Sequence, residues 1–151
     1  TGVYERIKEL AIRLDPSSIQ FIRYPSYKMQ LLAISNFGYN SKYIHSPHEE
    51  IKRLALGRYG EALEYIKNPS RDLQLAAVKS AGCAVRFIQD PDEEICLAAI
   101  KNNPKALGYI KNPTMLIRHK ALKLDTLNIM YINNPVEEEI LEAVYKESVS
   151  P

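Results

Sequence analysis

The side chains best suited to chemistry are three histidines, two cysteines, and lysines and tyrosines that recur at regular spacing. His45, His48 and Glu49 could supply metal ligands, but they lie across a proline turn rather than on one helix face, and no fourth ligand accompanies them. Cys83 and Cys96 have no histidine beside them that could act as a base. No glycine-rich phosphate loop is present either. We therefore predict no catalytic residue, no metal site and no cofactor.

Lysine occupies the same place in three successive copies of an internal repeat, at Lys79, Lys101 and Lys123. If the copies stack in register, these residues form a ladder of cations that could meet phosphates or an acidic protein surface. The alternative is an ordinary solvated helix flank, where lysine is common and favours the helix.

Aromatic side chains stand at places that are polar in the other copies, at Phe37, Tyr39 and Tyr59, and Arg58 precedes the last of these. Aromatic residues beside arginine are typical of partner-binding hot spots. They could equally fill gaps between early copies of the repeat, because large aromatic residues often belong to a core.

One copy departs most from the others at Arg118-His119-Lys120, where several copies have leucine or alanine. Such a local break marks either a functional site or sequence drift. Arg118 and His119 are therefore further candidates for contact with a partner.

These positions can be compared because the chain repeats itself every 22 residues. Each copy has a proline preceded by an aromatic residue and isoleucine, and an alanine follows eight residues later. The prolines are Pro25, Pro47, Pro69, Pro91, Pro113 and Pro135, and the alanines are Ala33, Ala55, Ala77, Ala99, Ala121 and Ala143. Self-similarity at a fixed spacing is typical of a stacked repeat array.

Each copy is predicted to be one helix followed by a shorter element. In the copy that starts at Asn68-Pro69, the asparagine is expected to cap the helix, with proline at its first position. Leu73, Ala77 and Val78 should then face inward. The helix should end at a left-handed glycine, as at Gly38, Gly60 and Gly82. The second element is one or two turns long, either α or 3₁₀.

The repeat predicts an all-α fold, a right-handed α-solenoid of about seven short helix–turn–short-helix repeats in one domain, 1–151. Residues 1–20 form an N-terminal partial repeat or cap, in which Ile7 and Ile12 take the places of Leu73 and Val78. Residues 21–130 form five full repeats, and residues 131–151 form an acidic C-terminal partial repeat or cap.

Charge and composition limit the classes of function. Residues 136–151 hold one lysine against five glutamates, whereas 19 Lys and Arg face 13 Asp and Glu before them, so the body is mildly basic and one end acidic. Two cysteines are too few for a disulfide framework, which favours a reducing, cytoplasmic setting. No apolar run approaches the length of a membrane span.

The sequences Tyr65-Ile66-Lys67-Asn68-Pro69 and Leu75-Ala76-Ala77-Val78-Lys79 resemble short helical repeats of uncharacterised function found in bacteria, phages and giant viruses. The resemblance covers roughly residues 21–147 and implies a fold rather than an activity. The rhythm is also similar to leucine-rich-variant repeats, which alternate an α-helix with a 3₁₀ helix in a superhelix.

Arrays of this kind offer extended surfaces, because each repeat adds a row of side chains without rebuilding the core. We therefore predict a non-catalytic scaffold, not an enzyme, that binds another protein. The alternative is a nucleic-acid binder that contacts the phosphate backbone along the lysine ladder. The chain is expected to be a monomer or to associate weakly head to tail.

Overall fold

The computed structural model describes the backbone of residues 2–149 and the side chains of residues 2–146. Within that range every regular element is a helix, and α-helices alternate along the chain with short 3₁₀ helices. The all-α prediction is confirmed. Close contacts group the chain into two compact units, Thr1–Ser80 (unit 1) and Ala81–Pro151 (unit 2). The predicted repeat and domain boundaries stay a prediction, and residues 1, 150 and 151 lie outside the described part.

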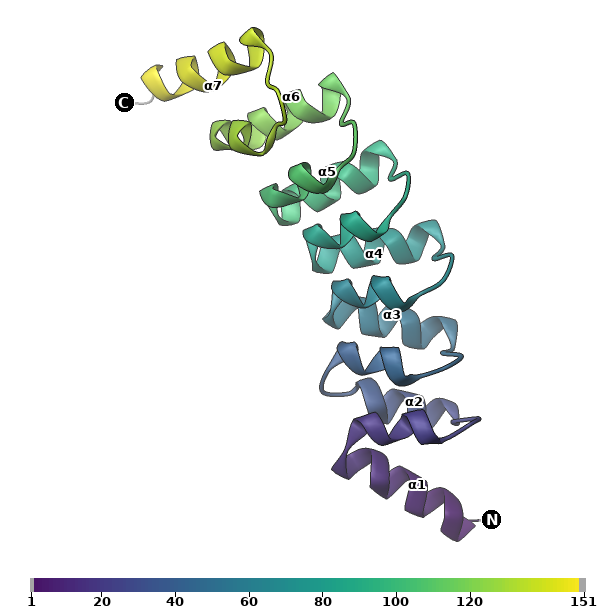
Figure 1. Ribbon diagram of the computed structural model, residues 1–151. Helices are drawn as coiled ribbons and strands as arrows, with labels where there is room; N and C mark the ends of the chain where they lie inside the picture. Colours follow the sequence, from purple (N-terminus) through teal and green to yellow (C-terminus); the bar gives the residue numbers. More distant parts are fainter. Residues whose placement is uncertain (1, 150–151) are drawn as a thin grey trace. The chain divides into compact units, whose positions relative to one another are not determined.

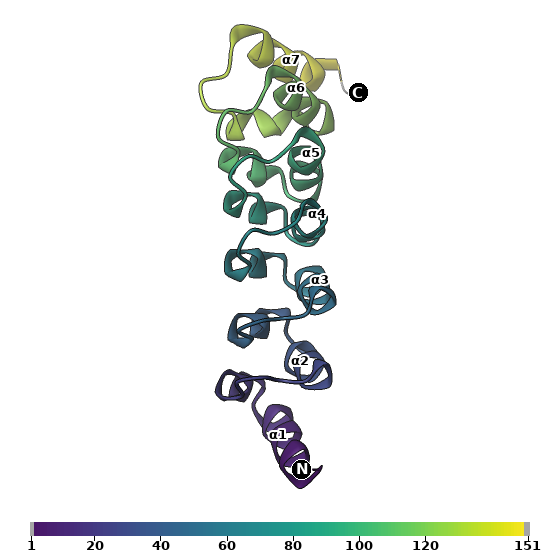
Figure 2. The ribbon, with the colours of Figure 1, turned by 90° about the vertical axis from the view of Figure 1, so that its right-hand side faces the viewer.

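Unit 1 contains four α-helices and three 3₁₀ helices. Each α-helix packs against the next α-helix, and each 3₁₀ helix against the next 3₁₀ helix, so the elements form two rows (Figures 1 and 2). In chain order the elements are α1 (Gly2–Leu14), η1 (Pro16–Phe21), α2 (Tyr27–Ile34), η2 (Gly38–Tyr43), α3 (Glu49–Arg58), η3 (Gly60–Tyr65) and α4 (Arg71–Ser80).

Unit 2 repeats the same arrangement of neighbours, with α5 against α6, α6 against α7, and the 3₁₀ helices against one another. Its elements are η4 (Gly82–Phe87), α5 (Glu93–Asn102), η5 (Pro104–Tyr109), α6 (Met115–Leu124), η6 (Thr126–Tyr131) and α7 (Glu137–Val149).

Much of the core comes from three places in each of the five central copies, four, eight and nine residues after the proline. In α4, Leu73 is 1% exposed, and Ala77 and Val78 are fully buried, as predicted. Burying one large aliphatic side chain contributes about 1.5–3 kcal/mol, and the alanine lets neighbouring helices approach closely. The same places are buried in the other central copies: Met29, Ala33 and Ile34; Ile51, Ala55 and Leu56; Ile95, Ala99 and Ile100; Ile117, Ala121 and Leu122.

The first helix buries less than the repeat pattern predicts. Ile12 is fully buried, but Ile7 is 57% exposed, although it takes the place of Leu73. The inward assignment of Ile7 was wrong, because α1 packs only against η1 and α2 in the described part of the chain.

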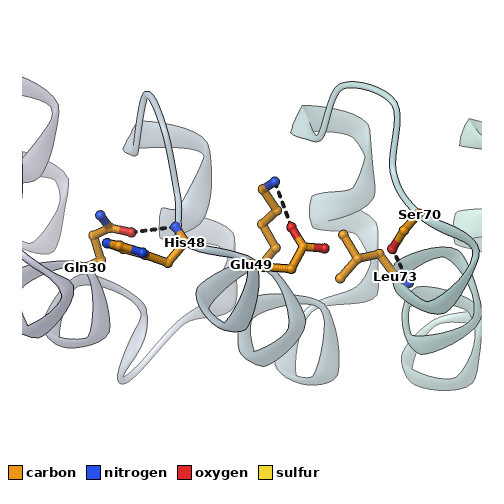
Figure 3. Close-up of polar contacts among 6 residues, drawn as sticks. Gln30, His48, Glu49, Ser70 and Leu73 are labelled. Atoms are coloured by element: carbon orange, nitrogen blue, oxygen red, sulfur yellow. Dashed lines mark hydrogen bonds and ion pairs between the residues drawn. The ribbon is translucent and has the colours of Figure 1, made fainter.

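The α-helices begin two residues after the proline rather than at it. The residue directly after the proline is the N-cap, as at Ser70, whose Oγ lies 3.4 Å from the amide nitrogen of Leu73 (Figure 3). The predicted capping role of Asn68 was therefore wrong. Asn68, Asn112 and Asn134 instead have φ of 47°, 49° and 54°. Asparagine tolerates this left-handed conformation better than most residues, and here it turns the chain into the proline.

The shorter element is a six-residue 3₁₀ helix in every copy within residues 2–149. The predicted left-handed glycines were wrong, since no described glycine has a positive φ. Gly38 and Gly82 instead stand at the start of η2 and η4, where a Cβ atom would run into the backbone carbonyl of Ala55 or Ala99 on the next α-helix. Glycine is needed there for close approach of two backbones.

Polar side chains also join successive α-helices. The buried Gln30 donates through Nε2 to the carbonyl of Pro25 at 3.1 Å and accepts through Oε1 from the backbone amide of His48 at 3.0 Å (Figure 3). Ser80 Oγ likewise donates to the carbonyl of Gly57 at 3.2 Å. These bonds fix the register of one copy on the next.

Candidate functional site

Four of the predicted binding residues, Phe37, Tyr39, Arg58 and Tyr59, lie together in unit 1. They line one hollow of about 730 Å³, which we call the aromatic depression. The rings of Tyr39 and Tyr59 meet edge to face, with centroids 5.6 Å apart and planes at 77°. Phe37 is 67% exposed, so its ring is available to a partner. The remaining lining residues are Ser35, Asn36, Gly38 and Asn40.

The aromatic depression forms because α2 ends sooner than its neighbour. It has 8 residues, whereas α3 has 10. At the end of α3 the Tyr59 amide donates to the carbonyl of Ala55 at 2.8 Å. At the corresponding place in α2, the carbonyl of Ala33 accepts from Nδ2 of the buried Asn40 at 3.0 Å. The equivalent bond from Asn128 to Ala121 leaves α6 at its full 10 residues, so this bond alone does not end α2 early. Residues 35–37 lie outside the helix, and Phe37 is at the surface.

The Arg58 side chain is hydrogen-bonded to the end of α2 at the edge of this depression. Its Nη1 donates to the carbonyl of Ile34 at 2.7 Å and also to that of Ser35. A cation at the last carbonyls of a helix both satisfies unpaired acceptors and interacts favourably with the helix dipole. Arg58 thus fixes the end of α2, and the predicted partner contact of this residue would come from the rest of its side chain.

Tyr39 connects the aromatic depression to a second group of side chains. Its ring lies edge to face with Tyr43 at 6.5 Å and with Tyr65 at 6.4 Å, measured between centroids. Lys42 Nζ stands 3.6 Å from the Tyr39 centroid and 4.8 Å from that of Tyr43. Each cation–π contact of this kind contributes about 0.5–1 kcal/mol at an exposed site.

Lys42, Tyr43 and Tyr65 were not among the predicted binding residues. Both tyrosines occupy the aromatic place before each proline, which the repeat assigns to packing. A signal was nevertheless present: five residues before the proline, only Lys42 and Arg86 are cationic among the six copies.

The three lysines of the predicted ladder are all exposed, in the last turns of α4, α5 and α6. Lys101 and Lys123 lie on neighbouring helices of unit 2. Lys101 borders a shallow hollow whose rim also carries Glu93 and Glu94. These carboxylates reduce the positive potential beside Lys101.

The break at Arg118 and His119 places both side chains against α7. Arg118 Nη2 donates to Glu139 Oε2 at 2.8 Å, and the two side chains are only 14% and 4% exposed. His119 Nδ1 lies 2.8 Å from Glu142 Oε2. Both residues therefore make contacts within unit 2, and Arg118 is largely buried there.

No three His, Cys, Asp or Glu side chains gather as potential metal ligands in the part of the chain that the structure describes. Burial, with a smaller effect from the charge of Asp92, raises the pKa of the Cys96 thiol to about 11. At neutral pH this thiol is protonated, and the thiolate is the nucleophilic form.

Comparison with known protein families, with curated proteins and with solved structures gives no match to this chain. Within residues 2–149 no helix is both long and apolar enough to cross a bilayer.

Proposed function

We propose that this chain is a non-catalytic repeat scaffold that binds another protein through the aromatic depression. The proposal includes a right-handed solenoid of about seven repeats, a cytoplasmic location, and a monomeric or weakly head-to-tail associated chain. Residues at the depression, above all Phe37, Tyr39 and Tyr59, carry the binding.

The observation that supports this proposal is the meeting of Phe37, Tyr39, Arg58 and Tyr59 in one hollow. Aromatic residues that line a concave surface with a few polar groups are typical of binding hot spots. The side chains are also held before any partner arrives: Arg58 bonds to the end of α2, and Tyr39 packs against three other tyrosines. Preorganisation of this kind reduces the entropy lost on binding.

The test is selection of displayed random peptides on the immobilised chain, followed by affinity measurements on variants. We expect Phe37→Ala and Tyr59→Ala to weaken the selected peptides at least about 10-fold, as truncation of a hot-spot residue does. Phe21→Ala is the matched control, because Phe21 is an 83% exposed aromatic elsewhere in unit 1. Equal affinity for all three variants would refute the proposal.

The second candidate function is binding of a nucleic-acid backbone along Lys79, Lys101 and Lys123. It is supported by the exposure of these side chains at one place of three successive copies. Such binding must weaken steeply as salt rises, because contacts with phosphates release counterions. A mobility shift of duplex and single-stranded DNA at low salt tests it, and the absence of any shift excludes it.

A further inference from the structure

A second hollow in unit 1 gathers cations beside the aromatic depression. It has a volume of about 390 Å³, and we call it the cationic cleft. Its lining includes Ser41, Lys42, His45, Lys52, Tyr65 and Lys67. Lys42 and Tyr65 also contact Tyr39, which lines the aromatic depression. The two hollows therefore share one continuous surface.

The positive charge in the cationic cleft is only partly balanced. Lys52 Nζ pairs with Glu49 Oε2 at 3.0 Å (Figure 3). In the described part of the chain no carboxylate pairs with Lys42, His45 or Lys67. Lys42 is held only by its contacts with tyrosine rings, which leave its ammonium charge unneutralised.

A buried hydroxyl group in the cationic cleft also lacks a partner. Ser41 is 8% exposed, and its Oγ makes no hydrogen bond within the described residues. Leaving a buried polar group unsatisfied is unfavourable, so such groups usually have a partner. Partial burial, with the charge of Glu64 adding to it, raises the pKa of the Tyr65 phenol. The phenol is therefore protonated at neutral pH, and its side-chain hydrogen bond with Glu64 also favours that form.

A smaller cleft of about 170 Å³ recurs at the same place in unit 2, lined by residues that include Arg86, Tyr109 and Lys111. Counted from the prolines, Arg86 corresponds to Lys42, Tyr109 to Tyr65, and Lys111 to Lys67. The Arg86 guanidinium lies 5.7 Å from the Tyr109 ring centroid.

The charge of the two clefts does not follow from the repeat alone. Each cleft combines two cations from consecutive copies. One lies five residues before a proline and the other lies two residues before the next proline. Only Lys42 with Lys67 and Arg86 with Lys111 meet this condition in the sequence. The other combinations contain at most one histidine: Gln20 with His45, Glu64 with Gln89, and Gly108 with Asn133. The packing of the repeat opens a hollow at this place, and the cations are particular to these two copies.

We propose that the cationic cleft binds the phosphoryl group of a phosphorylated serine or threonine on a protein partner, whose neighbouring apolar side chain enters the aromatic depression. The inference rests on the proposed protein-binding function. A phosphorylated side chain carries about −1.5 to −2 charges and three strong acceptor oxygens, which matches the three lysine side chains that line one small hollow. A carboxylate carries a single negative charge and two acceptor oxygens, so it needs fewer donors.

The test uses phosphoserine itself as the probe, so that it does not depend on the aromatic depression. We expect saturable chemical-shift changes in the backbone amides of Ser41, Lys42 and Lys67 on titration, measured by ¹H–¹⁵N NMR. Lys67→Gln should weaken this binding about 10-fold, which corresponds to about 1.4 kcal/mol for loss of one charge-assisted contact. Lys101→Gln is the matched control, since Lys101 is an exposed lysine outside both clefts, and it should leave the affinity unchanged.

Two results would overturn the inference. The first is the absence of saturable shifts at the cleft, and the second is equal affinity for phosphoserine and N-acetylglutamate. Neither depends on peptide selection at Phe37 and Tyr59, so failure of this inference and failure of the protein-binding proposal are distinguishable.

Discussion

Removing the Glu139 carboxylate should destabilise unit 2 strongly, because this charged side chain occupies a buried position that is apolar in the other copies. Four residues after the proline the other copies bury Met29, Ile51, Leu73, Ile95 and Ile117, whereas the last copy has Glu139, 3% exposed. Its Oε2 accepts from Arg118 Nη2 at 2.8 Å and from the Val136 amide at 2.9 Å. Arg118 also donates to the carbonyl of Asn134 at 3.1 Å.

The expected magnitude follows from what each substitution leaves behind. Removing one partner of a buried ion pair leaves an uncompensated charge and costs about 3–5 kcal/mol. Arg118 keeps its bond to Asn134, so we expect Glu139→Ala to cost about 3 kcal/mol, near the low end of that range. The double variant Arg118→Gln with Glu139→Leu places glutamine and an aliphatic side chain where α2 and α3 have Gln30 and Ile51. Replacing a buried pair by well-packed residues is often neutral or stabilising, so this variant should remain within about 1 kcal/mol of the native chain.

Urea unfolding followed by far-ultraviolet circular dichroism measures these free energies of unfolding. Glu138→Ala is the control, because the adjacent Glu138 is exposed and its loss changes the net charge equally. An equal loss of stability in Glu139→Ala and in the double variant would refute the reasoning, since the cost would then not come from an unpaired arginine.

Three further outcomes are expected. Gly82→Ala should lower the free energy of unfolding by about 1–3 kcal/mol through overpacking, whereas Gly108→Ala, with no atom near the added Cβ, should not; equal urea midpoints would contradict this. Asn112 has a φ of 49°, so Asn112→Gly should leave the free energy of unfolding unchanged, whereas Asn112→Ala should lower it by about 1–2 kcal/mol. An unchanged urea midpoint for Asn112→Ala would contradict the left-handed conformation at this residue. The pKa of the Cys96 thiol is raised to about 11 in the folded chain, from about 8.5 in the unfolded chain. The protonated thiol therefore contributes to the stability of the fold in full below the unfolded pKa, and this contribution is lost as pH rises toward the folded pKa. The urea midpoint should therefore fall less over that window in Cys96→Ala, and an identical fall in both chains would contradict it.

The spacing of the prolines and alanines was sufficient to predict the helices and their buried places. Ala77 and Val78 could be assigned because a side chain that recurs at a fixed place in every copy meets the same neighbours each time. The helix starts were misassigned because asparagine is common as an N-cap residue. Asparagine is also common at left-handed turn positions, and Asn68 adopts such a conformation. Local sequence does not distinguish these two uses of asparagine.

The aromatic depression was predicted in its residues but not in its cause. Phe37, Tyr39 and Tyr59 were visible as departures from the repeat. The early end of α2 was not predictable, because the residues after Ile34 could have continued the helix as the corresponding residues of α3 do. Lys42, Lys52 and Tyr65 of the cationic cleft were not predicted, because its lining comes from three segments, the end of η2 with the turn after it, the body of α3 and the end of η3. Only packing brings these segments together.

The most direct test of the proposed binding role is to locate a selected peptide on the chain by NMR cross-saturation. The account predicts that saturation passes from the bound peptide to the amides of Phe37, Tyr39 and Tyr59, and that Lys101 and Lys123 are unaffected. Saturation concentrated at those two lysines, with none at the aromatic depression, would contradict it.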